Sequence, residues 1–427
     1  MNSLRVRIGV LGLALMAGLA APTATASAGT APAPTVEEQR LDRAVPREIL
    51  RRSGFGTVAP ELAHALGSAH SYAQARRLVV REGSALWRRA VERAQGRGSA
   101  GGDLSRDDDR PLYWARLGMT REVRTWEPEF GLSDAQRSAL LSELERTSRG
   151  QTDIRYPHGK GVRRILVTGF DPFTLDRDIR ISNPSGATAL ALDGTVIRTA
   201  DGPARVETAV FPVRWQDFTG GTSQAFGSGG GTVERTLRPY LPKVDLFTTV
   251  SQGRVGRFDV EHTNGAWRGG FPDNDNVGRT ETVPVTDTAS QPQWTTTTLP
   301  YAAIVAARTG RFPVYDHTEV TEIPAGGTGP VVRADGPTPG SVARAGGGGD
   351  YLSNEIAYRA TLLRDRLGLH DSLPGGHVHT PVLQFGTGNT DPASGTVTDP
   401  EFVRNRLDII DQVRSIVTVA ADAEFRR

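Results

Sequence analysis

The spacing of apolar residues along the chain changes near residue 164. Before that point apolar residues recur at helical spacing, as Leu62 and Leu66 do, and residues 133–136 (SDAQ) form a capping box ahead of Leu140. After it, short apolar runs typical of buried strands alternate with helical patterns. This alternation predicts an α/β fold preceded by a helical N-terminal region.

The individual elements of the α/β part can be placed by their patterns. The predicted strands cover residues 165–167, 206–213, 244–250 and a run that ends near 379, and the predicted helices cover 232–240, 298–308, 353–363 and 400–417. Residues 309–340 are rich in Gly, Pro and Thr without periodicity, which predicts an inserted surface loop. Because functional sites in α/β sheets gather at the carboxyl ends of strands, we expect the functional residues to lie there.

The first residues predict export. Arg5 and Arg7 precede an apolar run over residues 8–21, and a small-residue cleavage site, Ala26-Ser27-Ala28, follows. The run is too short to span a bilayer, and no other segment is apolar enough. We therefore expect a signal peptide over 1–28, a secreted extracellular product without membrane attachment, a linker over 29–36, a helical region over 37–160 and the α/β domain over 161–427.

The composition of the chain excludes several kinds of partner and site. The chain has 427 residues, a formal net charge of +2 and no cysteine. A near-neutral charge gives no reason to expect a nucleic-acid partner, and the absence of Cys excludes disulfides, thiol nucleophiles and Cys-ligated metals. His377 and His379 share one face of a strand, but no third ligand has suitable spacing, so we expect no metal and no cofactor. The oligomeric state is not indicated.

A serine and a histidine in the last third of the chain can form a nucleophile and base. Ser353 follows the glycine run 346–349 and lies at a predicted helix start, where free N–H groups stabilise an oxyanion. His379 lies at a predicted strand end, one helix further along. The alternatives are that Ser353 only caps its helix and that His379 is an ordinary structural histidine.

Five separated motifs resemble the type I pyroglutamyl peptidases, cysteine hydrolases that remove an N-terminal pyroglutamyl residue. In chain order the motifs are Leu166-Val167-Thr168-Gly169-Phe170-Asp171-Pro172-Phe173, Asn183-Pro184-Ser185, Pro272-Asp273-Asn274, Thr298-Leu299-Pro300 and Gly376-His377-Val378-His379-Thr380-Pro381. They span residues 164–381, and the helical region before them has no counterpart in that family. The resemblance implies a three-layer α/β/α sandwich and a peptide substrate that begins with pyroglutamate.

The resemblance also implies roles for individual residues. His379 would be the base and Glu261 the acid that orients it, with Asp259 as the alternative acid. Phe170 and Phe173 would line an apolar slot for the lactam ring. Asn183 and Gln252 would lie at the polar edge of that slot.

The nucleophile departs from the family pattern. The Cys-Asn pair of the family is Ser353-Asn354 here. A serine hydroxyl does not ionise as a thiol does, so a well-placed base must remove its proton during attack. We expect a serine version of the peptidase, with Glu261, Ser353 and His379 as its triad. The alternatives are an inactive homologue that binds pyroglutamyl or related peptide termini, and a hydrolase for other acyl groups.

Overall fold

A computed structural model of the chain describes residues 32–157, 161–219 and 230–425. The predicted signal peptide over 1–28 and the start of the predicted linker lie outside these residues. None of the helices in the described part of the chain is long and apolar enough to cross a bilayer.

The first part of the described chain is helical. The Ser133 side chain accepts a hydrogen bond from the Gln136 N–H, and the Gln136 side-chain oxygen accepts one from the Ser133 N–H, which confirms the predicted capping box. The elements are α1 (Val36–Gln39), a 3-10 turn (Arg40–Asp42), α2 (Ala44–Ser53), α3 (Val58–Gly67), α4 (Tyr72–Ala94), α5 (Arg110–Thr125) and α6 (Asp134–Thr147).

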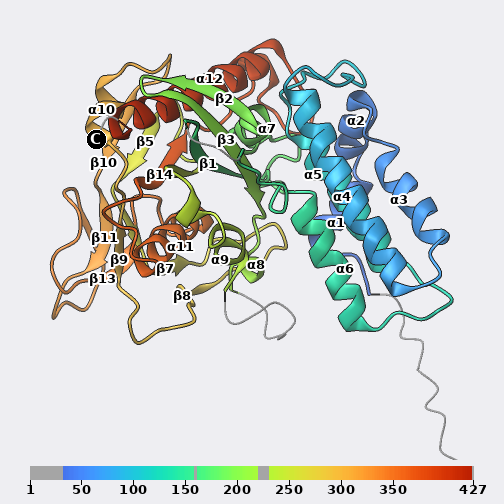
Figure 1. The fold of residues 1–427 in the computed structure, drawn as a ribbon, viewed down its shortest axis with the longest axis horizontal. Helices are drawn as coiled ribbons and strands as arrows, with labels where there is room; N and C mark the ends of the chain where they lie inside the picture. Colours follow the sequence, from blue (N-terminus) through green and yellow to red (C-terminus); the bar gives the residue numbers. More distant parts are fainter. Residues whose placement is uncertain (1–31, 158–160, 220–229, 426–427) are drawn as a thin grey trace, which may run out of the picture.

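A seven-stranded mixed sheet forms the centre of the second part (Figure 1). In spatial order its strands are β10 (Val314–His317), β5 (Phe258–Glu261), β14 (Gly375–Thr380), β4 (Leu246–Gln252), β1 (Arg163–Phe170), β3 (Gly202–Phe211) and β2 (Thr195–Thr199). Neighbours pair in parallel except for β14 with β5 and β2 with β3. The interior strand β1 is buried over its last six residues, as a strand covered on both faces must be.

Helices cover both faces of this sheet, so the predicted three-layer α/β/α fold class is confirmed. One layer contains α7 (Pro184–Leu192), α10 (Tyr301–Ala306) and α12 (Pro400–Glu424). The opposite layer contains α8 (Trp215–Thr219), α9 (Thr232–Leu237) and α11 (Leu352–Arg366). Figure 1 shows α12 and α11 on opposite sides of the strands. The apolar side chains of β1 alternate between the layers: Ile165 and Val167 pack toward α12, and Leu166 packs toward α11.

The segment over residues 309–340 differs from its prediction as a surface loop. It contributes β10 to the edge of the main sheet and two strands of a three-stranded sheet, because β-branched pairs such as Val331-Val332 find hydrogen-bonding neighbours that periodicity does not reveal. The smaller sheets contain β11 (Val320–Ile323), β12 (Val331–Arg333) and β13 (Val342–Ala345), then β6 (Thr263–Gly265) with β9 (Trp294–Thr296), and β7 (Trp267–Gly269) with β8 (Thr280–Thr282).

The helical region packs directly on the α/β part. Its core includes Trp87, Leu112 and Leu140, and it extends to Leu190 of α7 and Val210 of β3. In Figure 1 these helices lie beside the sheet on the side away from β10. The shared core explains why the region does not stand apart from the sheet.

Candidate active site

Glu261 and His379 form a buried hydrogen-bonded pair on neighbouring strands. Glu261 ends β5, His379 lies near the end of β14, and the His379 Nδ1 is 2.7 Å from the Glu261 Oε1. Burial raises the pKa of the Glu261 carboxyl, but its hydrogen bonds to His317 and His379 outweigh burial and hold the pKa well below its usual range. Because an ionised carboxylate only accepts hydrogen bonds, Nδ1 of His379 carries the proton and Nε2 is left as a base.

A glycine-rich loop brings Ser353 to this pair. A Cβ at Gly348 would lie 3.3 Å from the Cε1 of His379, and a Cβ at Gly347 would collide with the Glu261 carboxylate. The Ser353 Oγ donates a hydrogen bond to the Gly348 carbonyl oxygen at 3.0 Å. Ser353 and the His379 ring therefore both lie near Gly348, and a side chain at this position would crowd the ring.

The first turn of α11 is fixed by buried polar contacts. The Asn354 side chain accepts a hydrogen bond from the Gly265 N–H at 2.9 Å and donates one to the Gly265 oxygen at 2.8 Å. Glu355 receives paired hydrogen bonds from Arg268 at 2.6 and 2.7 Å. These contacts hold the helix start, whose first N–H groups have no partner within the helix, in one orientation beside Ser353.

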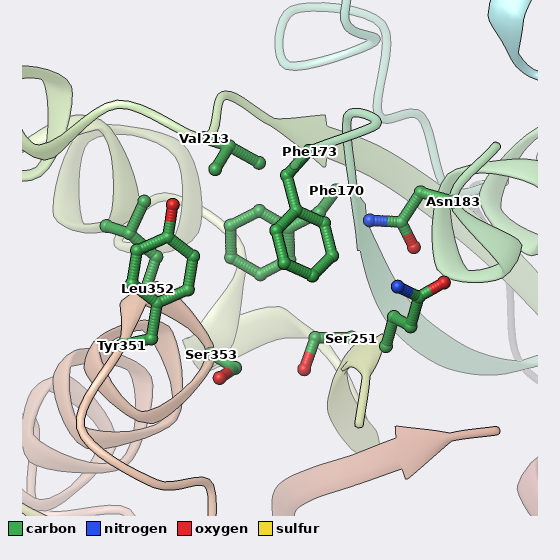
Figure 2. A pocket seen from close by; sticks show the side chains of 9 residues that line it. Phe170, Phe173, Asn183, Val213, Ser251, Tyr351, Leu352 and Ser353 are labelled. Carbon is green, nitrogen blue, oxygen red and sulfur yellow. The ribbon is translucent and has the colours of Figure 1, made fainter. Parts of the chain in front are cut away.

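A small pocket opens next to Ser353. Its empty volume is about 270 Å³ when the open solvent at its mouth is included, and it is lined by Phe170, Phe173, Asn183, Val213, Ser251, Gln252, Tyr351, Leu352 and Ser353. Figure 2 shows the rings of Phe170 and Phe173 above the hydroxyl groups of Ser251 and Ser353. The pocket is thus an apolar slot with a polar floor, and the predicted substrate-binding residues Phe170, Phe173, Asn183 and Gln252 all line it.

The polar groups of the pocket are engaged to different degrees. The Asn183 Oδ1 caps α7 by accepting from the Ser185 N–H and hydroxyl, at 3.1 and 2.8 Å, and its Nδ2 donates to the Asp171 carbonyl oxygen at 2.9 Å. The Gln252 Oε1 accepts from the Leu383 N–H at 3.3 Å, which leaves the amide NH₂ as a donor for a ligand. Asn183 therefore mainly shapes the pocket wall, and Gln252 has more freedom to bind a ligand.

The alternative acid, Asp259, has other partners. Its carboxylate pairs with Arg254 at 2.9 Å and with Arg257 at 3.0 Å. His377 is also occupied, because its Nδ1 lies 2.7 Å from the Thr249 hydroxyl and its Nε2 lies 2.8 Å from the Ser251 hydroxyl. Burial lowers the pKa of His377 well below its usual range, so this ring is neutral.

Side chains of the helical region hold the pocket loops. Asp109 accepts hydrogen bonds from the Ser182 hydroxyl and from the Asn183 N–H, the latter at 3.0 Å. Arg116 and Arg149 pair with the two oxygens of Asp171, at 2.6 and 2.8 Å. Asp171 lies between the pocket residues Phe170 and Phe173 in sequence, so these ion pairs position both rings.

A third contact reaches the Pro-Asp-Asn motif. The Asn274 Nδ2 donates to the Pro172 carbonyl oxygen at 2.9 Å and to Glu37 of α1 at 3.1 Å. The Glu37 carboxylate also accepts from the Tyr113 hydroxyl at 2.8 Å. The helical region therefore contacts two loops beside the pocket: the loop between β1 and α7, at both of its ends, and the loop that carries Asn274.

Comparison with known proteins places the chain in a family. Two family models match it: "PA0049 N-terminal domain" over residues 19–145, and "PA0049, C-terminal domain" over residues 164–288 and 312–384. The chain is 34% identical to "Uncharacterized protein PA0049" of Pseudomonas aeruginosa, over 91% of this chain and 89% of that relative. The chain belongs to the PA0049 family.

Solved structures with some similarity to this PA0049-family chain include pyrrolidone carboxyl peptidases. A mutant pyrrolidone carboxyl peptidase of Pyrococcus furiosus shares 22% identity at a TM-score of 0.38, over 61% of this chain and 99% of that one. Pyroglutamyl peptidase I of Bacillus amyloliquefaciens shares 19% identity at a TM-score of 0.38, over 61% and 97%. Similarities this distant support no conclusion about activity, which must be argued from the residues of the site.

Two residues that contact the site in this PA0049-family protein are not predicted by the sequence patterns. His317 binds the second oxygen of Glu261, and it lies in the segment predicted as a surface loop. Asp109 lies in a loop before α5, in a region where the sequence shows no catalytic pattern. Neither residue has a local sequence signal that links it to the site, because both contacts join segments far apart in the chain.

Metal chemistry has no evident ligand set here. Within residues 32–157, 161–219 and 230–425, no group of three His, Asp or Glu side chains is arranged to hold a metal ion. Glu261 instead offers its two oxygens to two imidazole rings. Because Nδ1 of His379 is bound to Glu261, the atom of this ring that is left for proton transfer is Nε2.

Proposed function

We propose that this protein is a hydrolase that removes N-terminal pyroglutamyl residues from peptides, with Ser353 as nucleophile, His379 as base and Glu261 as the acid that orients the base. The observation that carries the proposal is the position of Gly348. Its carbonyl accepts the Ser353 hydroxyl at 3.0 Å, and its Cα faces the His379 ring, beside a pocket of about 270 Å³. The candidate nucleophile and base therefore lie near one glycine, and the candidate nucleophile also lines the pocket that would take the acyl group.

The chemistry follows the logic of serine hydrolases. The Ser353 Oγ turns from the Gly348 carbonyl toward His379, its proton passes to Nε2, and Oγ bonds to the carbonyl carbon of the pyroglutamyl residue. The negative charge that develops on the carbonyl oxygen is stabilised by the free N–H groups at the start of α11. His379 then gives the proton to the leaving amine, and water releases the acyl group by the reverse sequence.

The pocket suits a small ring with polar edges. Phe173 and Tyr351 lie with ring centroids 6.0 Å apart, and Val213 adds a further apolar side chain. Ser251 and Gln252 supply hydrogen-bonding groups at the wall. A five-membered lactam carries an apolar edge, one N–H and one carbonyl, which this mixture of groups complements.

A binding protein without turnover is the second candidate. It is favoured by the present hydrogen bond of Ser353, whose Oγ donates to the Gly348 oxygen and not to His379. In that case the pocket would capture pyroglutamyl or related peptide termini, and the hydroxyl would have no catalytic task.

We also propose that the protein is exported, because residues 1–28 carry the features of a signal peptide. Terminal sequencing of the protein from culture medium should give a chain that begins after Ala28. An intact Met1 terminus on cell-associated protein would contradict export.

One assay separates the candidates. Purified protein is tested on a pyroglutamyl reporter and on the matched reporter with an N-terminal proline, which keeps the ring size but lacks the lactam carbonyl. Hydrolysis of the first only, with its loss in Ser353→Ala, supports the peptidase. Binding of pyroglutamyl peptides without hydrolysis supports the second candidate, and the absence of both contradicts the two.

A further inference from the structure

Glu261 binds two histidines, whereas one would suffice to orient a base. The His317 Nδ1 lies 2.6 Å from the Glu261 Oε2, and the His379 Nδ1 lies 2.7 Å from the Oε1. Glu261 is fully buried, and the His317 side chain is 11% exposed. Because the carboxylate only accepts, both rings donate from Nδ1, and each oxygen of Glu261 is held by its own ring.

The backbone places His317 for this contact. In the parallel pairing of β10 with β5, His317 is the direct partner of Glu261, so the two side chains lie on the same face of the sheet. The His262 N–H, next to Glu261, donates to the His317 carbonyl oxygen at 3.0 Å and continues the pairing. On the remaining side, Gly347 approaches Oε2 so closely that a Cβ would not fit.

We propose that His317 is a positioning residue of the active site, which fixes the second oxygen of Glu261 so that the first stays aligned with Nδ1 of His379. This inference rests on the proposed function. Without His317 the carboxylate is held by one hydrogen bond, can rotate about its last bond, and leaves a buried oxygen unpaired. A rotated Glu261 carboxylate no longer holds the His379 ring in position. A misplaced base slows the proton transfer without weakening substrate binding.

Two substitutions at residue 317 separate the hydrogen bond from the bulk of the ring. His317→Asn can place its amide N–H where Nδ1–H stood, and His317→Ala cannot. We expect His317→Ala to lower kcat roughly 10- to 100-fold with KM little changed, and His317→Asn to recover most of kcat. The matched control is His370→Ala, which removes a histidine–carboxylate pair with Asp365 at 2.9 Å outside the site and should leave kcat unchanged.

A second readout does not need turnover. In ¹⁵N-histidine NMR spectra, the His379 Nδ1–H bound to Glu261 should give a downfield proton signal. It should move or broaden in His317→Ala and stay in place in His317→Asn. If wild type hydrolyses no reporter, the proposed function fails, and this signal still tests the positioning.

Three results would overturn the inference in variants that unfold at the wild-type temperature. One is a His317→Ala variant whose kcat and His379 signal match wild type. Another is a rise in KM with kcat unchanged, which would assign His317 to substrate binding. The last is a His317→Asn variant whose kcat is as low as that of His317→Ala, because the effect would then not depend on the N–H donor.

Discussion

The carboxylate of Asp109 accepts a hydrogen bond from the backbone N–H of Asn183 at 3.0 Å. Asp109 precedes α5 of the helical region, and Asn183 lines the pocket beside Ser353. A residue of the N-terminal helices thus fixes the wall of a site that is otherwise built on the α/β sheet. This contact, together with those of Asp171 and Asn274, gives the helical region a task in shaping the pocket.

The burial of Asp109 predicts that stability depends on pH. Burial, and then the negative charge of Asp108, raise the pKa of Asp109 from 3.8 to about 7. The folded protein therefore keeps a proton that the unfolded chain releases, and the free energy of unfolding falls as pH rises from about 4 through about 7. Asp109→Asn resembles the protonated acid and should remove this contribution, on the order of a few kcal/mol.

Urea unfolding between pH 4 and pH 8 measures that change. Asp193 keeps part of the dependence in the variant, because burial and the charge of Glu207 raise its pKa to about 7 as well. Asp411→Asn, at a carboxylate with a 74% exposed side chain, is the control and should follow wild type. A pH dependence unchanged by Asp109→Asn would show that Asp109 is ionised throughout this range.

Arg116 should be needed for both stability and substrate affinity. Arg116→Met leaves the buried Asp171 carboxylate with Arg149 as its remaining ion-pair partner, which should lower the free energy of unfolding by about 3–5 kcal/mol. The loop that carries Phe170 and Phe173 then loosens, so KM for the reporter should rise. Arg76→Met is the control. Arg76 pairs with Glu143 on the surface, and such a pair contributes about 1 kcal/mol or less to the free energy of unfolding. Equal effects of the two substitutions would contradict the role of Arg116.

Ser353→Cys tests whether the site still favours a thiolate. The nearby His379 and the helix start should lower the pKa of the new thiol, and we expect pyroglutamyl hydrolysis that thiol-blocking reagents abolish. Wild type should resist those reagents because the chain has no cysteine. A silent Ser353→Cys variant that still binds pyroglutamyl peptides would indicate a binding site without catalytic geometry.

Glu261→Gln and Asp259→Asn decide which acid orients the base. The amide of Glu261→Gln can turn an N–H toward His379 and favour the wrong tautomer, so kcat should fall roughly 10³- to 10⁴-fold. Asp259 binds Arg254 and Arg257, and Asp259→Asn should change stability more than kcat. Steady-state kinetics of both variants, beside their unfolding curves, measure the difference. The reverse order of effects on kcat would transfer the role to Asp259.

Local sequence patterns predicted four strands of the main sheet and several helices, because burial imposes its period on the chain. The run around Ile165 became β1, the capping box at Ser133 begins α6, and the glycine run leads into α11. The α10 helix was predicted over 298–308 but covers Tyr301–Ala306, since Pro300 sits at its N-cap. In each case the residues that predict the element lie within it or a few residues from its end.

The sequence by itself determined the residue types of the site: Ser353 after a glycine run, His379 at a strand end and Glu261 beyond the third predicted strand. Only the tertiary structure decided their partners. In the folded chain Asp259 pairs with two arginines, and the amide of Asn183 caps α7. His317, from a segment without periodicity, binds Glu261. These contacts join residues far apart in the chain, and strand pairing and loop packing, which leave no local periodic trace, set which side chains meet.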